Sequence, residues 1–154
     1  MSATPTPHPA LRRLDFLVGR WRMRGHLVGS SEENIVGQAE FEWLPGGFFL
    51  RQRIQLDFAG FVQIQSEEII RYDPQDETFK SHVYSNVSPE PLPYEWDVRE
   101  DRSMTISVSY GPLDATFEGR LSEDGETFSG GWRPNPGADE TVNVPYDIAG
   151  SRLG

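Results

Sequence analysis

The segment Leu14-Asp15-Phe16-Leu17-Val18-Gly19-Arg20-Trp21 decides how this sequence is expected to fold. It completes a helical pattern over residues 9–17, whose leucines and phenylalanine gather toward one side. Gly19 closes the turn after this pattern, and Trp21 then begins a strand with its indole placed in one end of a core. We therefore predict a helical turn that closes one end of an antiparallel β-barrel.

After Trp21 the sequence alternates between apolar and polar residues, which is the pattern of half-buried strands. In residues 21–27 the odd positions are apolar or small and the even positions are charged. Segments rich in glycine, proline and acidic residues separate the strands. The predicted strands cover residues 21–27, 35–43, 48–58, 61–72, 79–87, 94–99, 104–110, 115–121, 127–132 and 141–148.

These strands follow one another through short connections, without the long crossover of a Greek key. This favours an up-and-down barrel over a two-sheet sandwich. The fold class is therefore all-β, with about ten antiparallel strands in the barrel. A barrel of that width cannot be filled by its own side chains, so it should enclose a ligand-sized cavity.

Composition limits the classes of function. The chain has 154 residues, no cysteine and a net charge of −10. The first nine residues carry alternating prolines and predict a flexible arm, so residues 10–154 form the single barrel domain. We find no signal peptide and no membrane-spanning apolar run. The absence of cysteine favours a cytoplasmic location and excludes disulfides and thiolate metal sites.

Charge also limits the partners. The negative net charge disfavours nucleic acid and anionic membrane surfaces. Arginines cluster at positions 12, 13, 20, 22 and 24, but they do not outweigh this balance. The three histidines are too scattered to predict a metal site, and no cofactor motif is present. A small ligand is the expected partner, and a homodimer is left open.

Five motifs together resemble a family of bacterial lipocalin-like domains of unknown function related to nitrobindin. They are residues 14–21, 43–50, 67–73, 81–86 and 117–130, which span most of the chain. The resemblance implies a ten-stranded barrel of the calycin type and no particular reaction. Nitrobindin holds haem through a histidine near the end of its chain. Because no histidine follows His82 here, the haem site is not carried over.

Two polar residues are the best candidates for an interior site. Glu68 shares its strand face with Val62, Ile64 and Ile70, apolar residues that are typical of a cavity wall. Burial there would raise the pKa of its carboxyl group and suit it to proton transfer. The alternative is that Glu67 and Glu68 straddle the wall and only reach the rim. Gln52 is a single amide among apolar neighbours, so it needs a hydrogen-bond partner in the wall or in a ligand.

His82 and Trp21 each have two interpretations. An inward His82 could exchange a proton with a ligand, whereas an outward one is a solvated strand residue, and alternation alone does not decide. Lys80 on the same face favours the outward orientation. The resemblance suggests that Arg152 lies across the indole of Trp21 by cation–π contact. We therefore take Gly19, Trp21 and Arg152 as structural, although Trp21 could instead be a platform for a ligand.

Two functions of different class fit this sequence. The leading one is a carrier or sensor that binds a small, mostly apolar or amphipathic molecule in the cavity. The alternative is a cofactor-free enzyme of the cyclase or isomerase type, with Glu68 or His82 as general base. A pure interaction module is a third class with little support. The residues expected to line the cavity are Trp43, Phe48, Leu50, Gln52, Glu68, Tyr72, His82 and Tyr84.

Overall fold

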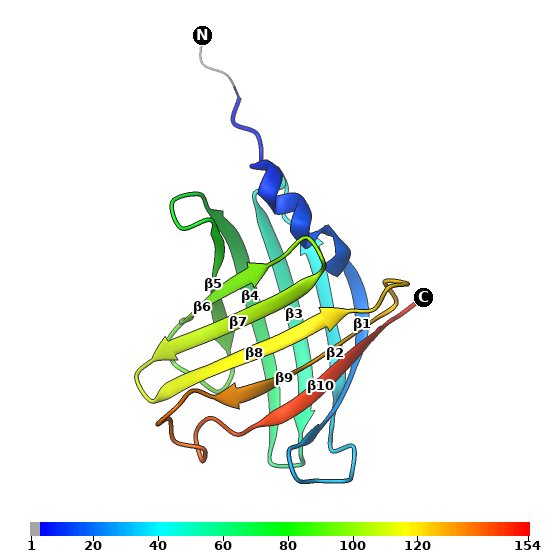
Figure 1. The fold of residues 1–154 in the computed structure, drawn as a ribbon, viewed down its shortest axis with the longest axis vertical. Helices are drawn as coiled ribbons and strands as arrows, with labels where there is room; N and C mark the ends of the chain where they lie inside the picture. Colours follow the sequence, from blue (N-terminus) through cyan, green and yellow to red (C-terminus); the bar gives the residue numbers. More distant parts are fainter. Residues whose placement is uncertain (1–3) are drawn as a thin grey trace.

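Ten antiparallel strands close into one barrel in the computed structural model, which describes residues 4–154 (Figure 1). Each strand pairs with its neighbours in chain order, and β1 pairs with β10 to close the sheet. The elements are η1 (Pro9–Leu17), β1 (Gly19–Leu27), β2 (Ile35–Trp43), β3 (Phe49–Phe58), β4 (Val62–Asp73), β5 (Thr78–Ser85), β6 (Leu92–Val98), β7 (Ser103–Tyr110), β8 (Leu113–Leu121), β9 (Thr127–Pro134) and β10 (Tyr146–Arg152). The predicted all-β barrel with a helical turn near the N-terminus is confirmed.

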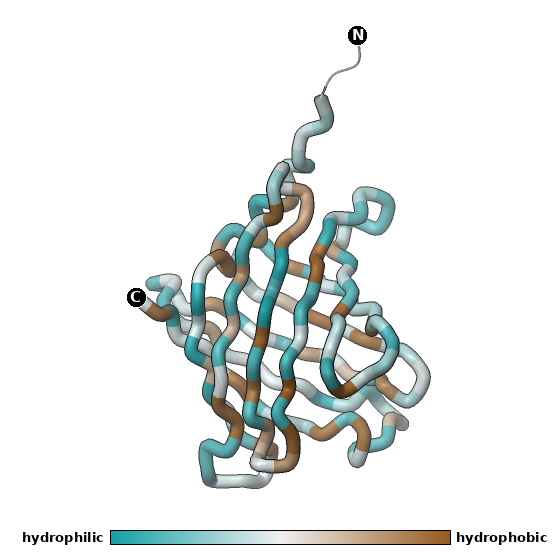
Figure 2. Tube along the Cα trace, turned by 180° about the vertical axis from the view of Figure 1, so that it is seen from behind, coloured by the Kyte–Doolittle hydropathy of each residue, from teal (hydrophilic) through white to brown (hydrophobic). Residues whose placement is uncertain are grey.

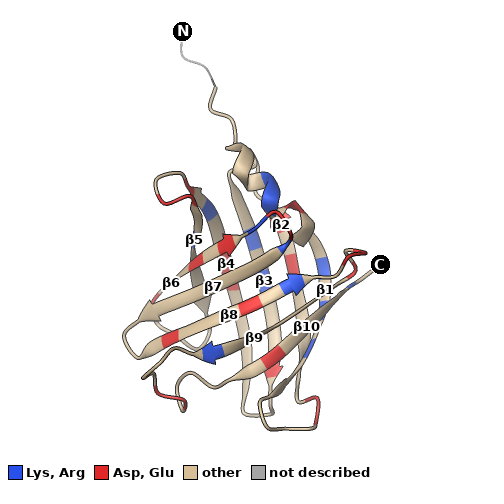
Figure 3. Ribbon diagram, in the orientation of Figure 1, with Lys and Arg blue, Asp and Glu red and all other residues tan. Residues whose placement is uncertain are grey.

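The alternation in the sequence becomes the two faces of the wall. On β1, Trp21 and Met23 are buried, whereas Arg22 and Arg24 are exposed. Hydrophobic and hydrophilic positions alternate along neighbouring strands in Figure 2, and charged residues recur along the strands in Figure 3. Because side chains of a strand point alternately to opposite faces, one wall serves both the core and the solvent.

The helix η1, a 3-10 helix, lies at one end of the barrel (Figure 1). It buries Leu11, Leu14 and Leu17 in the main core. His8 caps its first turn, because Nδ1 accepts a hydrogen bond from the backbone N–H of Ala10 at 3.0 Å. The beginnings of β1, β3, β5, β7 and β9 and the ends of the other strands meet at this end of the barrel.

The last predicted strand differs most from the structure. The final strand was expected over residues 141–148, but β10 runs from Tyr146 to Arg152. Residues 135–145 instead form a loop at the end of the barrel opposite η1. In the predicted N-terminal arm, the ring of His8 contacts that of Tyr72 with 4.4 Å between centroids. Residues 1–3 of that arm lie outside the described residues.

Asn143 explains why the loop at residues 135–145 does not continue as a strand. Its buried side chain accepts a hydrogen bond from the Asp114 N–H and donates to the carbonyls of Pro112 and Asp139. This amide therefore fixes the loop against the β7–β8 turn. Within residues 4–154, no helix is long and apolar enough to cross a membrane.

Candidate functional site

A cavity of about 480 Å³ lies inside the barrel and reaches Leu17 of η1 at one end. Leu17, Met23 and Phe41 line it on the side of η1. Val87 and Val142, which are partly exposed loop residues, line it at the mouth. Most of the wall between them is aliphatic or aromatic. The volume lies in the range of small-molecule pockets.

Glu68 of β4 places a carboxyl group in this apolar wall. Its side chain is 7% exposed. Oε2 accepts two hydrogen bonds, one from Ser81 Oγ of β5 at 2.5 Å and one from the indole Nε1 of Trp96 of β6 at 2.8 Å. Burial removes hydration from the charged form and raises the pKa of Glu68 to about 7, although both hydrogen bonds oppose this shift. Glu68 can therefore exist in both protonation states near neutral pH.

The second carboxyl oxygen of Glu68 faces the cavity. Oε1 has no hydrogen-bond partner within residues 4–154. In the same part of the chain, every fully covered side-chain nitrogen or oxygen has such a partner. Oε1 must therefore meet open space, and Glu68 lines the cavity. A ligand in the cavity can reach this oxygen.

Four other cavity groups share this property. They are the hydroxyl groups of Ser66, Tyr94 and Tyr146 and the amide of Gln52, which line the cavity without a side-chain hydrogen bond to any described residue. Burial, and next the charge of Glu68, raises the pKa of Tyr94 to about 12. Burial likewise raises the pKa of Tyr146. Both phenols are therefore neutral at physiological pH and can donate or accept hydrogen bonds.

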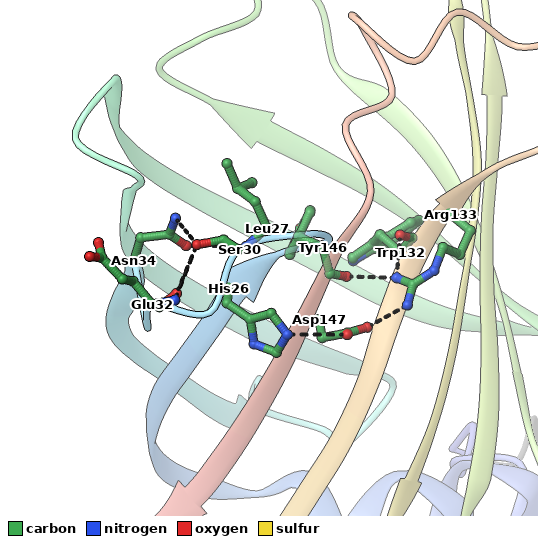
Figure 4. A network of polar contacts seen from close by, with 9 residues as sticks. All are labelled: His26, Leu27, Ser30, Glu32, Asn34, Trp132, Arg133, Tyr146 and Asp147. Carbon is green, nitrogen blue, oxygen red and sulfur yellow. Dashed lines mark hydrogen bonds and ion pairs between the residues drawn. The ribbon is translucent and has the colours of Figure 1, made fainter.

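Arg133 is the other charged residue among those that line the cavity within residues 4–154, and it belongs to the outer face of β9. Figure 4 shows its guanidinium group directed toward Asp147 and two backbone carbonyls. It donates to Asp147 Oδ1 at 2.7 Å and to the carbonyls of Trp132 and Tyr146. Asp147 also lies 3.6 Å from Nε2 of His26. Arg133 is therefore engaged outside the cavity.

The expected cavity residues divide into three groups. Gln52 and Glu68, cross-strand partners on β3 and β4, lie on the cavity wall. Leu50, Trp43, Phe48 and Tyr72 lie toward the η1 end and do not line the cavity. Leu50 is fully buried in the core. Tyr72 packs between His8 and Phe79, and Trp43 donates from Nε1 to Asp15 Oδ1 of η1.

His82 and Tyr84 lie on the outside, so the prediction that they line the cavity is wrong. Tyr84 is 52% exposed and His82 is also exposed. Their strand β5 directs Ser81 and Val83 inward instead. The register of β4 and β5 is the physical reason, because Glu68 pairs with Val83 whereas His82 pairs with the outward Ile69. The histidine proposed as an alternative base therefore cannot reach a ligand in the cavity.

Trp21 and Arg152 meet at the end closed by η1. The Arg152 guanidinium carbon lies 4.2 Å from the centroid of the Trp21 ring. Its nitrogens donate to the carbonyls of Phe16, Val18 and Gly125. The Trp21 indole donates to the Leu17 carbonyl at 2.9 Å. Gly19 has φ +126°, where L side chains are strained, and leaves room for Arg152 NH1.

The sequence analysis missed the aromatic part of the site. Tyr94 and Trp96 alternate with Glu95 and Asp97 along β6, which was a visible signal for an inward aromatic face. The rings of Tyr94 and Trp132 lie 5.9 Å apart, edge to face. Phe117 lies 5.6 Å from Trp132. Alternation could not show that these rings, which come from β6, β8 and β9, contact one another inside the barrel.

Neither a metal nor a haem site is supported by the residues present. Within residues 4–154 no group of three His, Asp or Glu side chains could hold a metal ion. The described cavity wall contains no histidine. The described wall therefore offers no histidine of the kind that holds haem in nitrobindin.

Residues 6–116 match the family model described as "Protein of unknown function (DUF1579)". The chain belongs to this family. The matched part runs from the residues before η1 into β8, and the remaining strands complete the barrel. None of the curated proteins matches the sequence.

Among solved structures, the barrel is similar to the S-type phycobiliprotein lyase from Guillardia theta. The TM-score is 0.57 with 14% sequence identity, over 93% of this chain and 92% of that one. At this identity the likeness shows the fold alone. It agrees with the calycin-type barrel that the DUF1579 protein was expected to form.

Proposed function

We propose that this DUF1579 protein binds a small, mostly apolar molecule inside the barrel, as a carrier or sensor. The observation that carries the proposal is the cavity of about 480 Å³, with a mostly apolar wall and five polar groups that have free hydrogen-bonding capacity, on Gln52, Ser66, Glu68, Tyr94 and Tyr146. Ligand sites are commonly built in this way, since the apolar wall gives affinity and the few polar groups fix orientation. The solved lyase structure has a similar barrel, but the proposal rests on the cavity of this protein.

The test uses the neutral fluorescent dye N-phenyl-1-naphthylamine, whose emission rises when it leaves water. We expect saturable binding by the parent protein. Ser66→Phe places a ring in the cavity, because Ser66 lines it, and should abolish the dye signal. The matched control is Gln65→Phe, one residue away on the exposed face of the same strand, which should bind normally. Equal binding by the two variants would refute a site inside the barrel.

Native mass spectrometry of protein purified from its own host tests the natural ligand. We expect an adduct of a small molecule that Ser66→Phe loses and Gln65→Phe retains. The measurement also reports the oligomeric state, and the homodimer remains a prediction until then. A cytoplasmic location and the relation to nitrobindin likewise remain proposals from the sequence.

A second candidate function is a cofactor-free enzyme with Glu68 as general base. The observation in its favour is the free Oε1 on a carboxyl group whose pKa is about 7, close to the optimum for proton transfer at neutral pH. Incubation with small-molecule extract of the host, followed by mass spectrometry, should then show a metabolite that the protein converts. Glu68→Gln should abolish this conversion and keep binding within a few-fold. A protein that binds a metabolite without converting any is the carrier.

A further inference from the structure

The described cavity wall holds a negative charge that is open to a ligand but no positive charge that is. Glu68 is the acidic residue of the described cavity wall, and Arg133 is the basic one. Arg133 is engaged by Asp147 and two carbonyls on the outer face. An anionic ligand group buried near Glu68 would therefore meet a like charge and no free cation. Because a buried charge is costly without a partner, this arrangement disfavours anions.

The geometry of Glu68 shows where the missing partner belongs. The protein supplies two donors, from Ser81 and Trp96, and both go to Oε2. Oε1 receives none and faces the cavity. A hydrogen-bond donor of the ligand at Oε1 would give both carboxylate oxygens a partner. A cationic donor would also neutralise the negative charge.

The neighbouring side chains are suited to a cation as well. Trp96 directs the N–H edge of its indole at the carboxyl group, and Tyr94 lies two residues before Trp96 on the same face of β6 and also lines the cavity. Trp132 lies against Tyr94, 5.9 Å away. Electron-rich aromatic faces attract ammonium groups. The same rings provide an apolar surface for the rest of the ligand.

We infer that the cavity selects molecules that join an apolar body to a protonated amine, with an N–H of the amine donated to Oε1 of Glu68. This inference rests on the proposed binding function and specifies the ligand class. The amine fills the position left open by the two protein donors. Its body lies among the aromatic and aliphatic side chains.

Binding of this kind should release protons near neutral pH. An ammonium group next to Glu68 favours the ionised carboxylate and so lowers its pKa. The other groups facing Glu68 do not compete, since Gln52 of β3, Val83 of β5 and Trp96 of β6 are uncharged and Tyr94 has a pKa of about 12. A neutral ligand that accepts a hydrogen bond from protonated Glu68 would take up protons instead.

The test compares three molecules with the same ring system: 1-naphthylmethylamine, 1-naphthalenemethanol and 1-naphthoate. Each displaces N-phenyl-1-naphthylamine from the parent protein at about pH 8, where Glu68 is mostly ionised. We expect the amine to bind about tenfold more tightly than the alcohol, as a charge-assisted hydrogen bond predicts. The naphthoate should be the weakest.

Glu68→Gln keeps the shape and the two protein donors but removes the charge. In this variant the amine should bind within about threefold of the alcohol, because neither molecule then meets a charge at residue 68. A circular dichroism spectrum and a urea midpoint at about pH 8 that are no worse than those of the parent show that the variant is folded. Glu67→Gln is the control, because Glu67 is exposed on the outer face of the same strand, and it should keep the full preference.

The outcomes separate this inference from the binding function. If the alcohol binds but the amine shows no preference, or the preference survives in Glu68→Gln, amine selection is refuted and binding stands. If neither the dye nor any naphthalene binds, the binding function fails and amine selection with it. Calorimetry at about pH 7 in buffers of different ionisation enthalpy checks the proton count. Proton uptake with the amine would also overturn the inference.

Discussion

The two ends of the barrel share one wall, but one end is filled by side chains and the other is hollow. At the end near η1, Trp21, Leu14 and Leu17 fill the interior, and none is more than 2% exposed. Beyond Leu17, which forms the boundary, the wall encloses a cavity of about 480 Å³. A ten-stranded barrel is too wide for its own side chains. The helix supplies the missing volume at one end, and where it does not reach, space for a ligand remains.

The ends also treat a charged side chain differently. Arg152 meets the Trp21 ring and donates to three backbone carbonyls. Glu68 receives two donors on one oxygen and none from the described residues on the other. The half-buried guanidinium group of Arg152 stabilises the fold through these contacts, whereas the free oxygen of Glu68 is available to a ligand. The predictions below test this contrast.

The largest effect is expected for Trp21→Ala. It removes a fully buried indole from the filled end and should lower the free energy of unfolding by about 3–5 kcal/mol. Urea denaturation followed by circular dichroism measures the change. Trp132→Ala, in the cavity wall, should cost less because its ring faces open space on one side. Equal losses would remove the distinction between the two ends.

The second largest loss of stability is expected for Arg152→Met. It keeps most of the side-chain length but removes the cation–π contact and the hydrogen bonds to the carbonyls around η1. We expect a loss of about 2 kcal/mol in the free energy of unfolding, from the unsatisfied carbonyls and the lost contact. The control is Arg20→Met, an exposed arginine on β1, which should change stability little. A similar loss in both variants would contradict the structural role of Arg152.

Glu68→Gln should change stability in a pH-dependent way. The pKa of Glu68 is raised to about 7 in the folded protein, from an ordinary value of 4.5. Its contribution to stability is therefore fully present below about pH 4.5 and is lost as pH rises to about 7. The full difference corresponds to about 3 kcal/mol. The variant should lack this decline and should equal or exceed the parent in stability at about pH 8.

Unfolding in urea across this pH range, for parent and variant, measures the effect. Glu67→Gln is again the matched control, since Arg51 and Arg53 lower the pKa of Glu67 at the surface. The pH dependence of stability from Glu67 has the opposite sign, because any stabilisation by this group is lost as pH falls. A parent protein and Glu68→Gln variant with parallel pH profiles would show that Glu68 titrates as if solvated.

The smallest effects are expected on the outer face of β5. His82→Ala and Tyr84→Ser remove exposed side chains, so each should change the free energy of unfolding by less than about 0.5 kcal/mol. Both variants should bind N-phenyl-1-naphthylamine like the parent. A loss of dye binding in either one would place a functional site outside the barrel and break the contrast drawn here.

The sequence by itself determined the barrel and its faces. Alternation over residues 21–27 identified the inward set of β1, and the leucine pattern with Gly19 identified the helix before it. Alternation also made Glu68 and Gln52 candidates for the interior, because each shares its strand face with apolar residues, and both line the cavity. These features are local, because a two-residue period and a helix end are set by neighbouring residues.

Only the tertiary structure decided which inward residues meet the cavity. A two-residue period gives the face of a side chain but not its height along the barrel axis, which depends on strand register and on the depth of η1. Leu50 and Gln52 share a face, yet Leu50 is in the filled end and Gln52 is in the cavity. The free oxygen of Glu68 depends likewise on Ser81 and Trp96, which come from two other strands.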